Sequence, residues 1–350
     1  MPEEPSWHSA ACLRMKALNN VFGSSEGDLL WSTWSFLAFP RPTLSILYTV
    51  YREGHIFGMD SFGESSVLLS VDPHGDGIRM ISGHDMNNSD MRVVVDEFEV
   101  DRHPESIFTD GVSLYYPDYD ARPGWVMRRS LCNDERRDLI RSPPGTDTYD
   151  NLSEANCVSN GQLFMVGYGA GKLFKTKIPP LPNEHLDGFR SPHPFIDGVE
   201  WKPVADLPVN RYSTVTDIDI IAEGDDKLRL VCVGYDDDSR ERFIYHFDSD
   251  RGGTLKRHSG ARLCKFVPSY DELVCVASRP DSQTFSWTIS LVDVWSMSVI
   301  YTLDYPCHSK YRSFCAYMAI TEGGLIVLAQ QRGSFDPLFK VIVWRLRFCS

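Results

Sequence analysis

The chain has 350 residues, of which 42% are hydrophobic and 24% are charged, and its formal net charge is −13 with a pI of about 5.2. These fractions are ordinary for a globular protein and exclude wholesale disorder. The acidic balance argues against binding to nucleic acid, because proteins that contact phosphates concentrate Lys and Arg. The densest basic stretches are Arg128-Arg129 with Arg136-Arg137, and Lys256-Arg257-His258, and we interpret each as a solvated face.

We expect neither an export signal nor a membrane-spanning helix. It begins Met1-Pro2-Glu3-Glu4, the reverse of a cationic secretory start, and no apolar run approaches the roughly 18 residues of a spanning helix. Nine cysteines form no Cys-x-x-Cys pair, and four lie in apolar runs typical of small buried side chains: Cys232, Cys264, Cys275 and Cys315. We therefore expect a cytoplasmic protein, with the nucleus as the alternative.

Residues 1–28 are predicted to hold one short helix and a lead-in to the main domain. The helix spans Trp7–Val21, where Ser6 can cap the N-terminus and apolar residues fall on one stripe. It is expected to pack on the outside of the protein, and a partner-binding helix is the alternative. The apolar run Leu29–Phe39 follows and is predicted to be a β-strand.

From Thr43 to Phe348 the sequence divides into six strand-rich units of roughly fifty residues. The first is predicted to open with the strand Leu44–Tyr51. In the last three units the third strand carries an aromatic residue near its end, at Tyr245, Trp295 and Trp344, with spacings of 50 and 49 residues.

Residues 29–350 are therefore predicted to form an all-β, six-bladed β-propeller. The last unit shows three strands where four are expected, and a strand from the N-terminal side, Leu29–Phe39, would complete it and remove an open edge. Two β-sandwiches are the alternative, because short strands at roughly 8–12-residue spacing suit both architectures.

Two strands resemble a known repeat type. Val292-Asp293-Val294-Trp295 and Val341-Ile342-Val343-Trp344 resemble the third strand of WD-type blades, although Ser296 and Arg345 replace the Asp that follows the Trp. Tyr245–Asp248 with Leu255–His258 is similar to the kelch-type propellers of plants, including those attached to F-box modules. The resemblance implies a propeller fold and assigns no activity.

No residue cluster reaches the specificity of a catalytic signature. The sequence has no His-x-His pair and no phosphate-binding P-loop, and we assign no catalytic, cofactor-binding or metal-binding residue and expect no cofactor. Asp248–Gly253 and Asp72–Gly77 have the alternating oxygens of a calcium loop. They lack its remaining ligands, and we interpret both as β-turns.

A proline-rich insertion at residues 178–208 is the most distinctive segment. It contains seven prolines, and long loops in compact folds are often functional. Its aromatic residues and an acidic run between two later strands are the predicted partner-binding residues: Phe189, Phe195, Trp201, Asp236, Asp237 and Asp238. A plain spacer and a solvated acidic loop are the alternatives.

We favour a non-catalytic protein–protein interaction scaffold, such as a substrate-recognition or adaptor module, with a protein partner and without nucleic acid or membrane. The alternative is a propeller hydrolase that acts on a sugar or small molecule. Its carboxylates would converge on the central channel from different blades, with Asp60, Asp110 and Asp217 as candidates.

Overall fold

The computed structural model describes the chain in fourteen segments: residues 41–75, 78–100, 106–117, 124–132, 137–143, 152–167, 171–179, 195–196, 199–208, 213–236, 238–279, 287–305, 316–331 and 338–349. The chain forms two compact units, one of residues 46–345 and one of residues 1–45 with 346–350. In the smaller unit the Thr43 hydroxyl donates a hydrogen bond to the Arg347 carbonyl oxygen at 3.3 Å. The strands of the blades described below belong to the larger unit, except for residues 41–45 and 346–349, which belong to the smaller one.

Six sheets form the blades, and their strands pair antiparallel except for β13 (Phe195–Ile196), which pairs in parallel with β9 (Arg137–Arg141). Blade one contains β2 (His55–Phe62), β3 (Ser66–Asp72), β4 (Arg79–Asp85) and β5 (Val93–Val100). Blade two contains β6 (Phe108–Thr109), β7 (Ser113–Pro117), β8 (Trp125–Ser130), β9 (Arg137–Arg141) and β13 (Phe195–Ile196). Blade three contains β10 (Leu152–Ser159), β11 (Gln162–Gly167), β12 (Lys172–Lys177) and β14 (Lys202–Asp206).

The second half of the chain supplies three more blades. Blade four contains β15 (Ser213–Glu223), β16 (Lys227–Asp236), β17 (Glu241–Asp248) and β18 (Gly252–Arg257). Blade five contains β19 (Ala261–Val267), β20 (Tyr270–Ser278), β21 (Trp287–Asp293) and β22 (Ser298–Tyr305). Blade six contains β23 (Ala316–Ile320), β24 (Leu325–Gln331), β25 (Leu338–Cys349) and β1 (Arg41–Glu53), with β1 beside β25.

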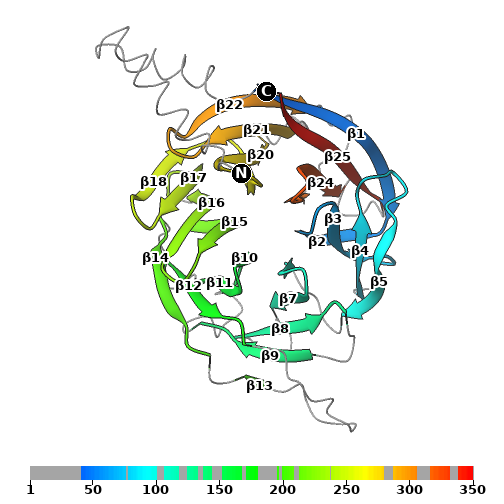
Figure 1. Ribbon diagram of the computed structural model, residues 1–350, viewed down its shortest axis with the longest axis horizontal. Helices are drawn as coiled ribbons and strands as arrows, with labels where there is room; N and C mark the ends of the chain where they lie inside the picture. The colour runs from blue at the N-terminus through cyan, green and yellow to red at the C-terminus, as the bar shows by residue number, and fades with distance from the viewer. Residues whose placement is uncertain are drawn as a thin grey trace, which may run out of the picture. The chain divides into compact units, whose positions relative to one another are not determined.

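The innermost strands of the six blades form a closed ring. They are β2, β6, β10, β15, β19 and β23, and each contacts the next, with β23 returning to β2 (Figure 1). Two β-sandwiches would instead pair their sheets face to face. The prediction of an all-β, six-bladed propeller is therefore confirmed. Within the described segments, no helix is long and apolar enough to cross a membrane.

The hydrophobic core is divided among the gaps between neighbouring blades. The gap between blades six and one, for example, buries Met59 and Leu69 against Val327 and Val341. Similar clusters fill the gaps between blades one and two, two and three, three and four, and four and five. Each central strand is therefore covered on both faces, which explains the continuous apolar runs in β16, β20 and β24.

The strand that joins blade six from the N-terminal side is β1, and its position corrects one prediction. Leu44–Tyr51 was expected to open the first blade, and this is wrong, because it lies in the outermost strand of blade six. Tyr48 and Val50 pack on the core, whereas Ile46 and Tyr51 are exposed, as suits an outer strand. The predicted closing strand Leu29–Phe39 and the helix Trp7–Val21 lie outside the described residues.

The interpretation of Arg128-Arg129 as a solvated face is also wrong. The two residues are 1% and 3% exposed. Arg128 lies opposite Asp138 in the β8–β9 pairing, and its Nε donates to Asp138 Oδ1 at 2.8 Å while a second nitrogen reaches Oδ2. The Arg129 guanidinium lies 3.8 Å from the ring centre of Phe98. A charge on a strand covered on both faces must be paired or stacked, and pairing depends on register, which the sequence does not display.

Gly54 makes the turn from the outer edge of blade six to the inner strand of blade one. Its φ is +108°, and a Cβ there would lie 2.5 Å from Val71 Cγ1 and 2.8 Å from the Asp72 carbonyl oxygen. We predict that Gly54→Ala lowers the free energy of unfolding by about 2–4 kcal/mol, through backbone strain and overpacking.

Gly63→Ala is the matched control, because Gly63 also has a positive φ, +65°, but has open space around it. It should cost only about 1–2 kcal/mol in urea unfolding, the cost of the left-handed backbone alone. Equal losses in the two variants would show that the turn at Gly54 is not sterically constrained.

Candidate functional site

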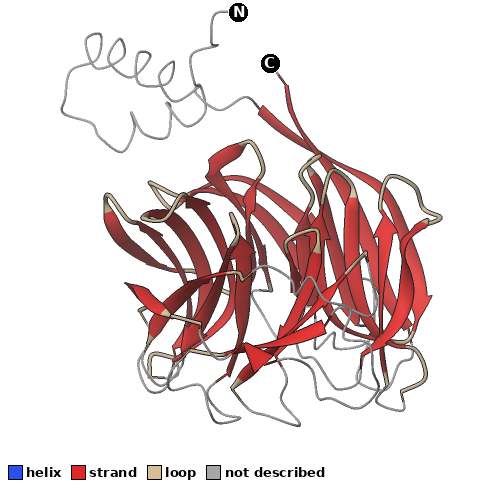
Figure 2. Cartoon of the chain, turned by 60° about the horizontal axis from the view of Figure 1, so that its bottom comes forward, coloured by secondary structure: helices blue, strands red, loops and turns tan. Residues whose placement is uncertain are grey.

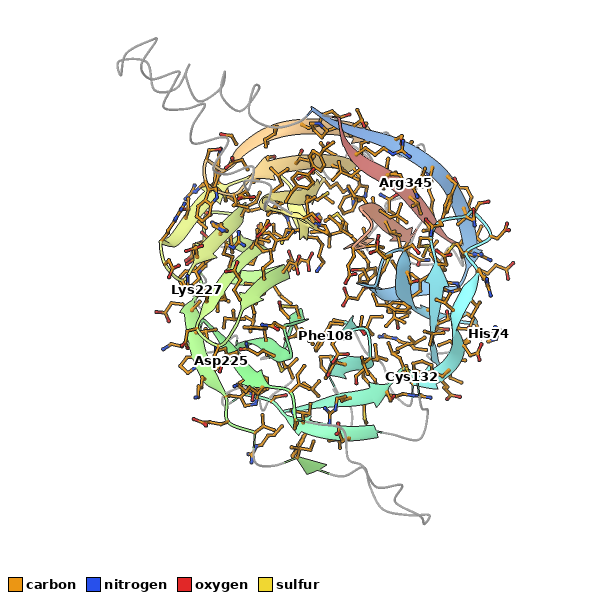
Figure 3. The ribbon with its side chains drawn as sticks, in the orientation of Figure 1. His74, Phe108, Cys132, Asp225, Lys227 and Arg345 are labelled. Carbon is orange, nitrogen blue, oxygen red and sulfur yellow. The ribbon has the colours of Figure 1, made fainter. Side chains whose placement is uncertain are left out.

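The inner strands of all six blades surround a cavity of about 370 Å³ at the centre of the ring. Phe108 of β6, labelled in Figure 3, lies at the inner edge of blade two and is one of the lining residues. The lining also includes Met59, Asn156, Trp287 and Tyr317, so aromatic, apolar and amide groups alternate around it. This cavity is the place where a propeller enzyme would hold its substrate.

The inner strands supply three aspartates, one lysine and one arginine to the cavity. Asp60 comes from β2, Asp217 and Asp219 come from β15, and Lys265 and Arg262 come from β19. Lys265 Nζ lies 3.2 Å from Asp217 Oδ1 and donates to the Ile218 carbonyl oxygen, also at 3.2 Å. The side chains of Lys265 and Asp217 are 17% and 16% exposed, so both remain accessible from the cavity.

Asp60 uses both carboxylate oxygens to bind backbone N–H groups. Its Oδ1 accepts the N–H of Ser61, the next residue, at 2.9 Å. Its Oδ2 accepts the N–H of Thr109 on β6 at 2.8 Å. The second bond joins blade one to blade two across the gap between their inner strands, so the carboxylate acts as a tie between blades.

Asp217 and Asp219 repeat this arrangement between blades four and five. One oxygen of each accepts the N–H of the following residue, at 3.0 Å in both cases. The other oxygen accepts an N–H on β19, from Cys264 at 2.9 Å for Asp217 and from Phe266 at 2.8 Å for Asp219. Because side chains two apart on a strand share one face, the two aspartates tie successive positions of the same neighbouring strand.

The proton affinities of these groups follow from burial and mutual charge. Burial raises the pKa of Asp60 to about 6, against the opposing effect of Lys265. Burial also raises the pKa values of Asp217 and Asp219. Burial alone would lower the pKa of Lys265, but the three carboxylates outweigh it and raise this pKa. Lys265 therefore stays an ammonium at neutral pH and is unsuited to act as a base or nucleophile.

The described cysteines near the cavity are not activated. Burial raises the pKa of Cys157 and of Cys264 well above the ordinary value, so both remain thiols. Cys232 and Cys275, also predicted to be buried, are buried and free, whereas Cys315 lies outside the described residues. Among the described His, Cys, Asp and Glu side chains, no group of three is placed to hold a metal ion.

Of the three carboxylates proposed for a hydrolase, the structure brings two to the cavity. Asp60 and Asp217 line it, but Asp110 is absent from its lining. Asp110 Oδ1 accepts the N–H groups of Val112 and Ser113, and Oδ2 accepts the Tyr115 hydroxyl at 2.8 Å. Asp110 therefore caps the β6–β7 turn.

The proline-rich insertion of blade three is anchored on blade two. Arg128 of β8 donates to the Pro179 carbonyl oxygen, β13 pairs in parallel with β9, and the Trp201 indole N–H donates to the Arg141 carbonyl oxygen at 2.7 Å. Trp201 also packs against the apolar cluster between blades two and three. Phe189 and the side chain of Phe195 lie outside the described residues, so their part in binding a partner stays a prediction.

The acidic run lies in the β16–β17 turn. Asp236 Oδ1 accepts the Asp238 N–H at 3.2 Å and Oδ2 accepts the Ser239 hydroxyl at 2.8 Å, while Asp237 lies outside the described residues. Figure 2 shows the strands of the blades as arrows. Neighbouring strands alternate in direction in blades three and four, so the β16–β17 turn and Trp201, which precedes β14, lie at opposite ends of their blades' strands. The described members of the two predicted partner-binding groups, Trp201 with Asp236 and Asp238, are therefore not brought together.

Sequence reasoning missed Asp219, Lys265, Arg242 and Arg262, all of which line the central cavity. The sequence does contain a signal for Asp219 and Lys265. Asp217-Ile218-Asp219 places two acids on one face of an inner strand, opposite a lysine on the next unit's first strand. Nothing local in the sequence marks the two arginines, because their proximity depends on how blades four and five pack.

No family model matches the chain, and no curated protein sequence matches it. Similar solved structures exist at low identity. One is a subtype N10 neuraminidase-like protein of A/little yellow-shouldered bat/Guatemala/060/2010, with 10% identity, 87% of this chain and 100% of that chain covered, and a TM-score of 0.45. The Dos1 propeller is 12% identical, with 82% of this chain and 70% of that chain covered and a TM-score of 0.39. Prolyl oligopeptidase B from Galerina marginata is 11% identical, with 82% of this chain and 38% of that chain covered and a TM-score of 0.41. We draw nothing about function from these similarities.

The raised pKa of Asp60 predicts a measurable pH dependence of stability. The folded value of about 6 exceeds the ordinary 3.8, so the folded state binds the proton more tightly, and this group stabilises the fold increasingly as pH falls. The difference in unfolding free energy, wild type minus Asp60→Asn, should rise by about 1 kcal/mol from pH 7 to pH 5 in urea titrations.

Asp225→Asn is the control, because Asp225 is exposed and pairs with Lys177, which lowers the pKa of its carboxyl. Its difference from wild type should stay nearly constant over this pH range. A constant difference for Asp60→Asn as well would show that the Asp60 carboxyl is not held in a desolvated position.

Proposed function

We propose that the chain is a non-catalytic interaction scaffold that recognises another protein, as a substrate-recognition or adaptor module does. The observation that carries this proposal is that the aspartates lining the central cavity already accept hydrogen bonds from backbone N–H groups. Asp60, Asp217 and Asp219 each give one oxygen to the following N–H group and the other to the neighbouring blade. Their position is explained by closure of the ring without any role in chemistry.

A hydrolase would require two of these aspartates to act on a bound substrate. Glycoside hydrolysis needs one carboxyl that protonates the leaving group and a second that acts as base or nucleophile. Here two N–H donors hold each carboxylate, and Lys265 compensates part of their charge. A substrate would have to compete with the bonds that join the blades, which makes these aspartates poor general acids.

The periphery of the propeller supports contact with a protein. Outer strands expose large apolar side chains: Ile46 and Tyr51 on β1, Val93 and Val94 on β5, Leu255 on β18 and Val299 on β22. All six residues of β18 are exposed. An exposed edge strand offers backbone N–H and C=O groups for the addition of a strand from a partner. The protein partner, the cytoplasmic location and the resemblance to WD-type and kelch-type repeats belong to this proposal.

One observation favours the propeller hydrolase as a second candidate. A carboxyl with a pKa of about 6, in a cavity that also contains Asp217 and Asp219, has a proton affinity suited to general acid catalysis near neutral pH. This candidate requires that Asp60 reach a bound substrate while it still accepts the Thr109 N–H.

Affinity capture with an insertion variant tests the scaffold. Residues 181–194 are replaced by a Gly/Ser linker of equal length, which retains Pro179, β13 and Trp201 and therefore the anchors on blade two. The tagged intact chain should retain a specific protein from a lysate of the cells that express it, and the variant should retain at least about tenfold less by quantitative mass spectrometry.

The same replacement at residues 332–337, between β24 and β25, is the matched control and should retain the partner. The purified chain is also screened against glycoside and ester substrates. Hydrolysis that Asp60→Asn abolishes in a folded protein, without a captured partner, would replace the scaffold by the hydrolase. Capture unaffected by the insertion variant would overturn the predicted role of the insertion.

A further inference from the structure

A second cavity, of about 360 Å³, lies between blades four and five. Its lining is strongly cationic, with five arginines and one histidine: Arg240, Arg242, Arg257, Arg262, Arg279 and His258. Glu241 is the one acidic residue in the lining, and it pairs with Arg257. We call this cavity the arginine pocket. It shares Arg242 and Arg262 with the central cavity, so the two arginines form a common wall.

The short link between the two blades brings the arginines together. Residues His258–Gly260 connect β18 to β19, and the Arg279 N–H donates to the Gly260 carbonyl oxygen at 2.8 Å. The Arg242 guanidinium, from β17, donates to the Ala261 carbonyl oxygen at 3.2 Å. Side chains from β17, β19 and the end of β20 therefore meet over one linker, held by backbone contacts on two blades.

The positive charge of Arg242 and Arg262 is poorly compensated. No carboxylate in the described part of the chain pairs with Arg242 or Arg262, and the buried Nε of Arg262 has no hydrogen-bond partner there. Burial and the neighbouring Arg262 lower the pKa of Arg242 to about 10, and burial and Arg279 lower the pKa of Arg262.

Such a cluster is unexpected in a protein with a net charge of −13 and 48 acidic residues. Like charges brought together with partial loss of water destabilise the fold, and buried charges are normally paired. An anion bound among the three guanidinium groups would offset this cost. The cavity lies within the range of about 300–1,000 Å³ typical of small-molecule sites, so it accommodates an anionic group with an organic part.

We propose that the arginine pocket binds a phosphoryl group. Three guanidinium groups, from Arg242, Arg262 and Arg279, exceed the charge of a single carboxylate, whereas a phosphoryl dianion with three terminal oxygens matches them better. The planar donor fork of arginine suits this geometry. The Tyr235 ring, which lines the pocket and lies 5.5 Å from the Arg242 guanidinium, provides a surface for the remainder of the ligand. This site does not depend on the scaffold role.

The phosphoryl group can belong to a free phosphate compound or to a phosphorylated residue of a protein, and binding measurements distinguish the two sources. The intact chain is titrated calorimetrically with pyrophosphate, with a short phosphoserine peptide and with the same peptide unphosphorylated. Acetate serves as the carboxylate probe. Pyrophosphate or the phosphopeptide should bind at a single site, and whichever binds more tightly identifies the source.

Arg262→Gln and Arg242→Gln should each weaken that binding by at least about tenfold, the effect of losing one hydrogen bond to a charged group. Arg251→Gln is the control, because it removes the same charge from an exposed position in the turn between β17 and β18, outside the pocket lining. It should leave affinity within about twofold. Without ligand, the two pocket variants should unfold at an equal or higher temperature than wild type, since each removes a like charge.

Arg240→Gln keeps the test decisive if a buried variant folds poorly, because Arg240 lines the pocket but is exposed. It should also weaken binding, though less. The proposal is overturned if no phosphoryl probe binds saturably at millimolar concentration, if acetate binds as tightly as pyrophosphate, or if the pocket variants and Arg251→Gln lose affinity equally.

Discussion

In this propeller the inner strands are joined by carboxylates that accept backbone N–H groups of the next blade. Asp60 makes such a bond between blades one and two, and Asp217 and Asp219 make two between blades four and five. An inner strand faces the channel with backbone groups that its own sheet leaves unpaired, and buried N–H groups must find acceptors. The chemistry available in the central cavity follows from this constraint, because its acidic residues already have partners.

The interface between blades four and five carries two cavities that share one wall. Asp217, Asp219 and Lys265 face the central cavity, Arg279 lines the arginine pocket, and Arg242 and Arg262 line both. The acids are held by N–H donors and by the ammonium of Lys265. Arg242 and Arg262 have fewer partners of this kind in the described part of the chain. Closure of the ring accounts for the aspartates, whereas the arginines are the residues that a bound anion would stabilise.

Blades two and three are joined differently, through the proline-rich insertion. Arg128, paired with Asp138 in the interior, also binds the Pro179 carbonyl oxygen, and Trp201 binds the Arg141 carbonyl oxygen farther along. These contacts explain why the base of the insertion carries an aromatic residue, Trp201, that packs against the apolar cluster between blades two and three.

The sequence by itself determined the class of fold, the number of blades and the position of most strands, because strand periodicity and turn residues are local properties. The recurrence of Tyr245, Trp295 and Trp344 marks the equivalent strands β17, β21 and β25, although Trp295 lies in the turn that follows β21 and not within the strand. Only the tertiary structure decided that Leu44–Tyr51 completes blade six, that Arg128 is buried against Asp138, and that Asp219 and Lys265 share a cavity with Asp60. These facts depend on strand register and on contacts between blades about fifty residues apart in sequence. Side-chain environments of that kind are set by packing, for which a single sequence carries no local signal.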